Sequence, residues 1–260
     1  MSSMSGIFKS SLGKKYLMAG TGLVLLSFVI GHLIGNLQVF GPPELINRYA
    51  EFLHSKPALL WSARLGLLAV LVIHIGTAAR LTIENKAARP VGYAGGVAFG
   101  STWVSRHMFL SGAVILAFVV YHLAHFTWRL PAVNGLGDFT KLQTVLDGKT
   151  VPDVYGIMIL GFQVWWVVLL YLIAQILLLA HLSHGIASAF FSLGLRNQVW
   201  APRLKRAGLI LSVALFLGFV SIPAAIFTRV IGADYAEKAR LELRAATQFE
   251  AALAQGKEAK

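Results

Sequence analysis

The sequence contains no cysteine among its 260 residues. Because thiolates hold iron–sulfur clusters and many zinc sites, and cysteines attach c-type haem, the chain itself can hold none of these groups and no disulfide. Charge is also scarce, since 13% of the residues are charged and 57% are hydrophobic. This composition lies outside the range of soluble proteins and indicates an integral membrane protein.

Acidic residues are few, with 11 Asp and Glu against 23 Lys and Arg. None of them lies deep in a long apolar stretch, so the sequence offers no carboxylate relay for protons across a membrane. The basic excess lies beside the apolar stretches, which is a topology signal and argues against a nucleic-acid partner. The side with the N-terminus and the loops 84–106 and 194–206, counted with Arg80 at the adjoining helix end, carries eleven Lys and Arg against one acid, and the loops and helix ends of the other side carry seven against five. We therefore expect a cytoplasmic N-terminus and an external C-terminus.

Five apolar stretches are each long enough to cross a hydrocarbon core of roughly 30 Å as a helix; they cover about 16–40, 59–83, 107–128, 154–193 and 207–230. The first follows several lysines, as in a signal peptide, but its length and the lack of a cleavage site predict a retained helix. The fourth is about 60 Å long as one helix, so part of it must tilt or project. We predict an all-α, multi-pass bundle of five transmembrane helices over 1–232, followed by a charged helical tail over 233–260 outside the membrane.

Six of the eight histidines lie in the first four stretches, and the fifth stretch has none; they are His32, His74, His122, His125, His181 and His184. At about 1.5 Å per helical residue, His32 and His122 each lie about 25 Å from the inner face. His74 lies about 9 Å from that face, and His181 comes late in a helix that runs toward it. The depths predict an outer layer with His32 and His122 and an inner layer with His74 and His181, although depth alone does not separate His181 from His184.

Paired histidines on opposed helices can each give one axial bond to a haem iron, so two layers predict two bis-histidine b haems. For any single intramembrane histidine, a hydrogen bond to a neighbouring helix is an equally good explanation. His125 and His184 each follow a predicted ligand by three residues. For these two we expect a hydrogen bond or a contact with a haem propionate in place of an axial bond.

Several short motifs resemble one known family in their order and spacing. They are Gly-Thr-Gly-Leu and Gly-His-Leu within 20–33, Ile-His at 73–74 with Asn85 and Ala-Arg-Pro at 88–90, Tyr-His-Leu at 121–123, and His-Leu-Ser-His-Gly-Ile-Ala-Ser-Ala-Phe at 181–190. The family is the dihaem cytochrome b558-type membrane anchor of succinate dehydrogenase and fumarate reductase, or complex II. The resemblance implies axial ligands at His32, His74, His122 and His181. It assigns the outer haem to the first and third helices and the inner haem to the second and fourth.

The same resemblance implies partners that the residues themselves do not show. These are a flavoprotein subunit with FAD and an iron–sulfur subunit, both on the cytoplasmic face of a bacterial inner membrane. Electrons would pass from them through the two haems to a quinone, which we expect to be menaquinone. The chain would then be a membrane anchor and electron conductor with no succinate chemistry of its own.

A quinone site needs an apolar slot and one or two hydrogen-bonding groups. Candidates bracket the start of the second apolar stretch, namely Asn47, Glu51, His54 and Arg64, of which we favour Glu51. Each of them is equally well explained as a solvated loop residue. Two other functions stay open: a cytochrome b subunit of a hydrogenase or formate dehydrogenase, and a histidine-based transporter of metal ions or protons. A transporter more often has acidic intramembrane residues and two related halves, which this sequence lacks.

Overall fold

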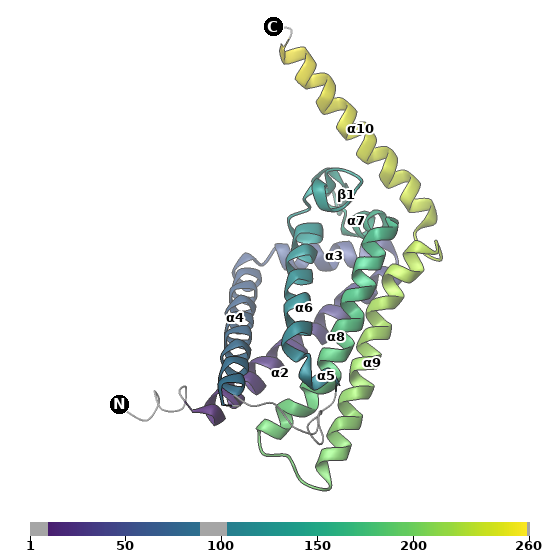
Figure 1. Ribbon diagram of the computed structural model, residues 1–260. Coiled ribbons are helices and arrows are strands. Elements are labelled where there is room, and N and C mark those ends of the chain that lie inside the picture. The colour runs from purple at the N-terminus through teal and green to yellow at the C-terminus, as the bar shows by residue number, and fades with distance from the viewer. Residues whose placement is uncertain (1–9, 89–102, 259–260) are drawn as a thin grey trace. The chain divides into compact units, whose positions relative to one another are not determined.

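The computed structural model describes residues 10–88 and 103–258, and this part of the chain is mostly helical (Figure 1). Five helical segments are long and apolar enough to span a membrane: α2 (Ser11–Asn36) with η1 (Leu37–Phe40), α4 (Pro57–Ala87), α6 (Met108–His122) with η2 (Leu123–Thr127), α8 (Trp165–Ser192) and α9 (Trp200–Phe227). The predicted all-α membrane protein with five spans is confirmed at this level. The direction of the N-terminus stays a prediction.

The fourth apolar stretch is not one helix, as we had expected, but two. Helix α7 (Val154–Gly161) ends at Phe162, and α8 begins at Trp165. The Asp153 carboxylate starts α7 by accepting a hydrogen bond from the Gly156 amide at 3.0 Å. The break explains the excess length, because only the 28 residues of α8 form the membrane-spanning helix.

The fifth span begins at Trp200, seven residues earlier than its apolar stretch. The Asn197 side chain forms the turn before the helix, since its Oδ1 accepts from the backbone amides of Val199 at 3.0 Å and Trp200 at 2.7 Å. The basic residues from Arg203 to Arg206 therefore lie in the first turns of α9 and not in a loop. Their charge marks the end of the apolar run without ending the helix.

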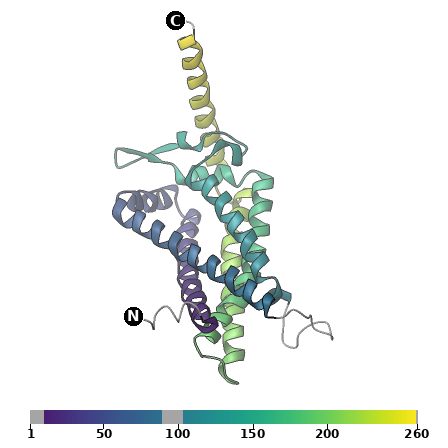
Figure 2. The same ribbon diagram turned by 60° about the vertical axis from the view of Figure 1, so that its left-hand side comes forward.

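Two of the expected connections contain regular structure. Helix α3 (Pro43–His54) lies between the first two spans, while the connection after η2 holds η3 (Pro131–Val133), η4 (Phe139–Lys141) and a hairpin of β1 (Gln143–Leu146) and β2 (Lys149–Pro152), visible in Figure 2. Both turn residues of the hairpin have positive φ, 51° at Asp147 and 77° at Gly148. An Asp-Gly pair is favoured in such two-residue turns because Gly adopts positive φ without strain.

The chain divides into two compact units. The first unit is Met1–Leu33, Ala58–Leu116 and Ala174–Leu217; it includes α5 (Trp103–Arg106). The second unit is Ile34–Pro57, Ala117–Ile173 and Gly218–Lys260; it includes α3, the hairpin, α7 and the C-terminal helix α10 (Ala233–Glu258).

The second unit has an apolar core built around α7, in which every residue from Tyr155 to Gly161 is buried. Its other fully buried side chains include Val39, Phe139 and Val167. Helix α10 packs onto α7 through a stripe of small and apolar side chains at helical spacing, namely Ala236, Ala239 and Leu243. The core thus ties the tail helix to the second unit.

The first unit buries a different set of side chains. Among its described residues, the buried positions are mostly alanines, branched aliphatic residues and polar residues, and none is aromatic. The buried polar side chains of this unit are Lys14, Thr77, Ser111, Gln175 and Ser212. Lys14 forms an ion pair with Glu84, which joins the start of α2 to the end of α4.

Candidate functional site

The first unit brings together two of the predicted ligands from different helices. His74 comes from α4 and His181 from α8, and both are partly buried. Their imidazoles lie close enough to interact electrostatically. We call His74, His181 and the hydroxyl residues that contact them, Thr21 and Ser111, the first-unit histidine site.

The hydrogen bonds of Thr21 indicate which nitrogen of His74 carries the proton. Its Oγ1 lies 3.1 Å from Nδ1 of His74, and its hydroxyl proton is donated to the Leu17 carbonyl at 2.6 Å. Since a hydroxyl has one proton to donate, Thr21 must accept from the imidazole. Nδ1 therefore carries the hydrogen, and Nε2 keeps its lone pair.

Ser111 on α6 holds His181 in the same way. Its Oγ lies 3.1 Å from Nδ1 of His181, and its proton is donated to the Met108 carbonyl at 3.0 Å. The same reasoning gives His181 a protonated Nδ1 and a lone pair on Nε2. A metal-bound histidine needs this tautomer, with Nδ1–H held by a neighbouring acceptor.

A glycine follows each of these hydroxyl residues and faces the imidazole. A Cβ on Gly22 would lie 3.3 Å from Cε1 of His74, and a Cβ on Gly112 would lie 3.5 Å from Cε1 of His181. Each ring thus packs with its Nδ1–Cε1 edge against the backbone of the neighbouring helix. The two hydroxyl–glycine pairs, one on α2 and one on α6, form matching cradles for the two histidines.

The structure distinguishes His181 from His184, which depth along the helix does not. Nε2 of His184 lies 3.0 Å from the Ser188 hydroxyl, one turn further along α8. A nitrogen engaged in this contact is not available for an axial bond unless the contact is broken. The hydrogen bonds favour His181 as the ligand of this pair.

In the second unit, His122 and His125 share one phenol. Nδ1 of each lies 3.1 Å from the Tyr171 hydroxyl, so Tyr171 can donate to one imidazole and accept from the other. The two rings must then differ in tautomer. We call His122, His125 and Tyr171 the second-unit histidine site.

The His125 side chain is 0% exposed. It belongs to η2 and lies in the core of the second unit. Its ring centroid lies 4.1 Å from that of Phe126, and a Cβ on Gly161 would lie 2.9 Å from Nε2. This Nε2 has no hydrogen-bond partner among the described residues. With backbone so close, there is no room for a macrocycle at Nε2 of His125, which leaves His122 as the better candidate ligand.

The remaining predicted ligand, His32, lies in the first unit and stacks on Phe28 of the same helix, with ring centroids 5.4 Å apart. Its predicted partner His122 belongs to the second unit. The pairing of these two residues in an outer haem site stays a prediction.

The four predicted quinone residues have separate surroundings. Asn47 is buried and structural, since its amide donates to Asp153 and accepts from the Tyr155 backbone, both at 3.0 Å. Glu51 lines a cavity of about 190 Å³ whose other charged walls are Arg48, Asp147 and Lys149.

The other two lie on exposed helix surfaces. His54 contacts the Ala50 carbonyl of its own helix through Nδ1 at 2.8 Å. Arg64, in the first unit, lies over the Trp61 ring at 5.3 Å. The Glu51 cavity is smaller and more charged than the apolar pockets that usually hold small molecules. A quinone site at these residues therefore stays a prediction.

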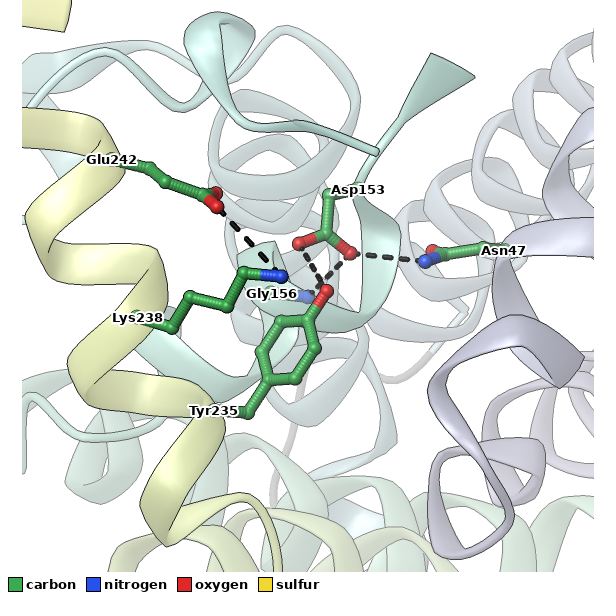
Figure 3. A network of polar contacts seen from close by, with 6 residues as sticks. All are labelled: Asn47, Asp153, Gly156, Tyr235, Lys238 and Glu242. Atoms are coloured by element: carbon green, nitrogen blue, oxygen red, sulfur yellow. Dashed lines mark hydrogen bonds and ion pairs between the residues drawn. The ribbon is translucent and has the colours of Figure 1, made fainter. Parts of the chain in front are cut away.

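A buried carboxylate that sequence reasoning missed joins three helices of the second unit (Figure 3). Asp153 is 1% exposed and accepts from Asn47 on α3, from the Gly156 amide of α7 and from the Tyr235 hydroxyl of α10 at 2.9 Å. Burial and the negative charge of Asp153 raise the pKa of Tyr235 well above its usual value. Three donors satisfy the carboxylate without a cation, which identifies Asp153 as a structural centre.

The first-unit histidine site fits the demands of a bis-histidine haem. Such a site needs two imidazoles from different helices, and each must have a lone pair on Nε2. His74 and His181 meet both demands. Within residues 10–88 and 103–258, no three His, Asp or Glu side chains converge as they do around a bare metal ion.

Comparisons with protein-family models, with curated proteins and with solved structures found no match.

Proposed function

We propose that this chain is the membrane anchor and electron-transfer subunit of a succinate:quinone oxidoreductase and that it holds two b haems between histidines. One observation carries the haem part of the proposal. In the first unit, His74 and His181 come from two different spans, and both are held in the tautomer that leaves Nε2 unprotonated. Two histidines held alike on two spans match the pair of axial ligands that a bis-histidine haem requires.

In this proposal, each histidine site holds one haem. His74 and His181 supply the axial nitrogens of one haem, and Thr21 and Ser111 hold their rings in position. His122 supplies one axial nitrogen of the other haem, with Tyr171 bound to its Nδ1 and His32 as the predicted second ligand. A bound haem contributes a one-electron redox centre within the membrane.

The partner subunits are those that the family resemblance implies, and the composition of the chain agrees with them. A sequence without cysteine offers no ligands for thiolate-bound iron–sulfur clusters, and its long segments are membrane spans and one tail helix. The basic face predicted to be cytoplasmic suits the docking of acidic or neutral soluble subunits. Succinate oxidation and the flavin would then belong to those subunits, while quinone would exchange electrons with the membrane chain.

The test begins with a dithionite-reduced spectrum and a haem-to-protein ratio of the purified protein. We expect a b-type alpha band and two haems for each chain. Mild-detergent affinity purification should bring down a flavoprotein and an iron–sulfur protein, and succinate should then reduce the haems of that complex. A purified protein without haem would contradict the proposal.

The main alternative is a cytochrome b subunit of another quinone-linked complex, of the hydrogenase or formate dehydrogenase type. It shares the bis-histidine argument, so the spectrum alone does not separate the two. If hydrogen or formate reduces the haems of the intact complex and succinate does not, the alternative replaces the complex II assignment while the haem sites stand.

A further inference from the structure

We infer that Thr21 and Ser111 are positioning residues that set the reduction potential of the haem held by His74 and His181. The inference rests on the proposed function, because it requires a haem at the first-unit histidine site. It goes beyond that function by assigning a role to two residues that the proposal does not count among the ligands.

The direction of each hydrogen bond is fixed by the helix that carries the hydroxyl. Thr21 donates to Leu17 at 2.6 Å, and Ser111 donates to Met108 at 3.0 Å. Both hydroxyls are therefore permanent acceptors for the imidazole N–H, which lies 3.1 Å away in each case. A carbonyl of the preceding helical turn is a common acceptor for a Ser or Thr hydroxyl proton within a helix, which leaves the hydroxyl oxygen to accept from the imidazole.

An acceptor on Nδ1–H makes the imidazole a more basic ligand through its other nitrogen. A more basic axial ligand stabilises ferric iron more than ferrous iron, and it therefore lowers the reduction potential. The couple is a one-electron exchange in which the proton remains on Nδ1 throughout. The electron comes from, or goes to, the iron–sulfur subunit on one side and the quinone on the other.

The influence of the two hydroxyls should be confined to one haem. Thr21 and Ser111 contact His74 and His181, whereas the second-unit histidines contact Tyr171. The glycine after each hydroxyl keeps the imidazole edge close to its acceptor. Loss of one hydroxyl should then change one potential and leave the other where it was.

The experiment is a potentiometric titration of the haem-loaded complex, followed at the alpha band, for Thr21→Val and for Ser111→Ala. Thr21→Ser keeps the acceptor and serves as the rescue variant. Two matched controls remove helix-bonded hydroxyls that contact no histidine: Ser27→Ala, whose hydroxyl donates to Leu23, and Ser221→Ala, whose hydroxyl donates to Gly218. The electron paramagnetic resonance spectrum of the ferric state gives a second reading of ligand basicity.

We expect Thr21→Val and Ser111→Ala each to raise the midpoint potential of one haem and to shift its ferric resonance. Loss of a residue that holds a metal ligand typically changes metal binding or activity about 10- to 100-fold. If the ratio of ferric to ferrous stability falls tenfold, the midpoint potential rises by about 59 mV. Thr21→Ser, Ser27→Ala and Ser221→Ala should keep the wild-type potentials. If Thr21→Val loses the haem, Ser111→Ala and Thr21→Ser still test the inference.

Unchanged potentials in variants that retain both haems overturn the inference and leave the proposed function intact. Equal shifts of both haems, or the same shift in a control, also overturn it, because the effect is then not local. A wild-type protein without haem overturns the proposed function and this inference together.

Discussion

The histidine sites of the two units differ in the hydrogen-bond partners of their ring nitrogens. In the first unit each of His74 and His181 has an aliphatic hydroxyl of its own and leaves Nε2 with a lone pair. In the second unit His122 and His125 share the single hydroxyl of Tyr171, and Nε2 of His125 ends against the backbone at Gly161. The difference shows that the environment of each ring nitrogen, more than the presence of a histidine in a membrane helix, separates a candidate ligand from a core residue.

The same contrast extends to packing. The second unit buries aromatic residues such as Phe139, Phe162 and Tyr171, whereas the described part of the first unit buries small and polar ones. Buried aromatic side chains bury large areas and pack closely against the side chains around them, so they contribute strongly to stability. We therefore expect the second unit to respond to substitutions mainly through stability and the first unit mainly through haem binding.

The largest expected effect is the loss of a whole haem from the first unit. His74→Ala and His181→Ala should each retain about one haem per chain, because an axial bond is removed. His184→Ala should retain two, since its Nε2 already contacts Ser188. Haem content from a reduced spectrum measures this, and haem loss in His184→Ala with retention in His181→Ala would reassign the ligand.

The corresponding pair in the second unit should give two different kinds of result. His122→Ala should lose about one haem, whereas His125→Ala should retain both. His125→Ala also opens a cavity in an aromatic core, which we expect to lower stability by roughly 2–5 kcal/mol. Haem content and thermal unfolding of each variant separate the two outcomes, and two haems in His122→Ala would reverse the assignment.

The next largest effect is a difference in stability between two glycine-to-alanine substitutions, one at each histidine site. In Gly161→Ala the new Cβ would lie 2.9 Å from Nε2 of His125, in a fully buried region, and we expect a loss of about 1–3 kcal/mol. In Gly112→Ala the new Cβ would lie 3.5 Å from His181, which is an ordinary contact. Chemical or thermal unfolding compares the two, and equal destabilisation would show that the imidazoles are packed alike.

Removing the shared phenol should have a smaller effect. Tyr171→Phe keeps the ring in the core and deletes the oxygen that serves both histidines, and the loss should be about 0.5–1.5 kcal/mol. Both haems should remain, with a shift in the potential of the haem bound by His122 only. A shift in the other haem instead would mean that the two sites are not separated as described.

The smallest expected effect is a loss of stability of the second unit at alkaline pH. The pKa of Tyr235 is raised by burial and by Asp153, so this phenol is easier to ionise in the unfolded chain. Its contribution is full below the ordinary phenol pKa of about 10 and declines as the pH rises toward the higher folded value. Thermal unfolding between pH 8 and 11 should show a decline that is weaker in Tyr235→Phe, and an unaltered decline would assign it to other groups.

Much of the membrane architecture could be predicted from the sequence, because apolar length is a strong signal for a span. The break before Trp165 was missed, since Phe162 and Val164 are as apolar as the helices they separate. The hairpin was also missed, although Asp147-Gly148 carries a known turn signal. The starts of α2 and α9 and the end of α4 lie several residues outside the predicted apolar stretches, because charged side chains mark the edge of the apolar layer and not the end of a helix.

For the candidate site, the histidines could be found by their positions, but their states could not. Sequence spacing places His181 and His184 on nearly the same face, and only the Ser111 and Ser188 contacts separate them. Thr21 lies in the quoted Gly-Thr-Gly-Leu motif, but nothing in the sequence pairs it with His74 or pairs Ser111 with His181. The partner of a side chain on another helix depends on helix packing, which single-sequence periodicity does not give.

The three-way contact at Asp153 also sets an order of events during synthesis. Asn47 emerges from the ribosome early, Asp153 at mid-chain and Tyr235 near the end, yet all three meet at one buried carboxylate. Until α10 has been made, that carboxylate lacks one of its donors, and α7 lacks the helix that covers it. The second unit therefore completes its core only after the fifth membrane span and α10 have been translated.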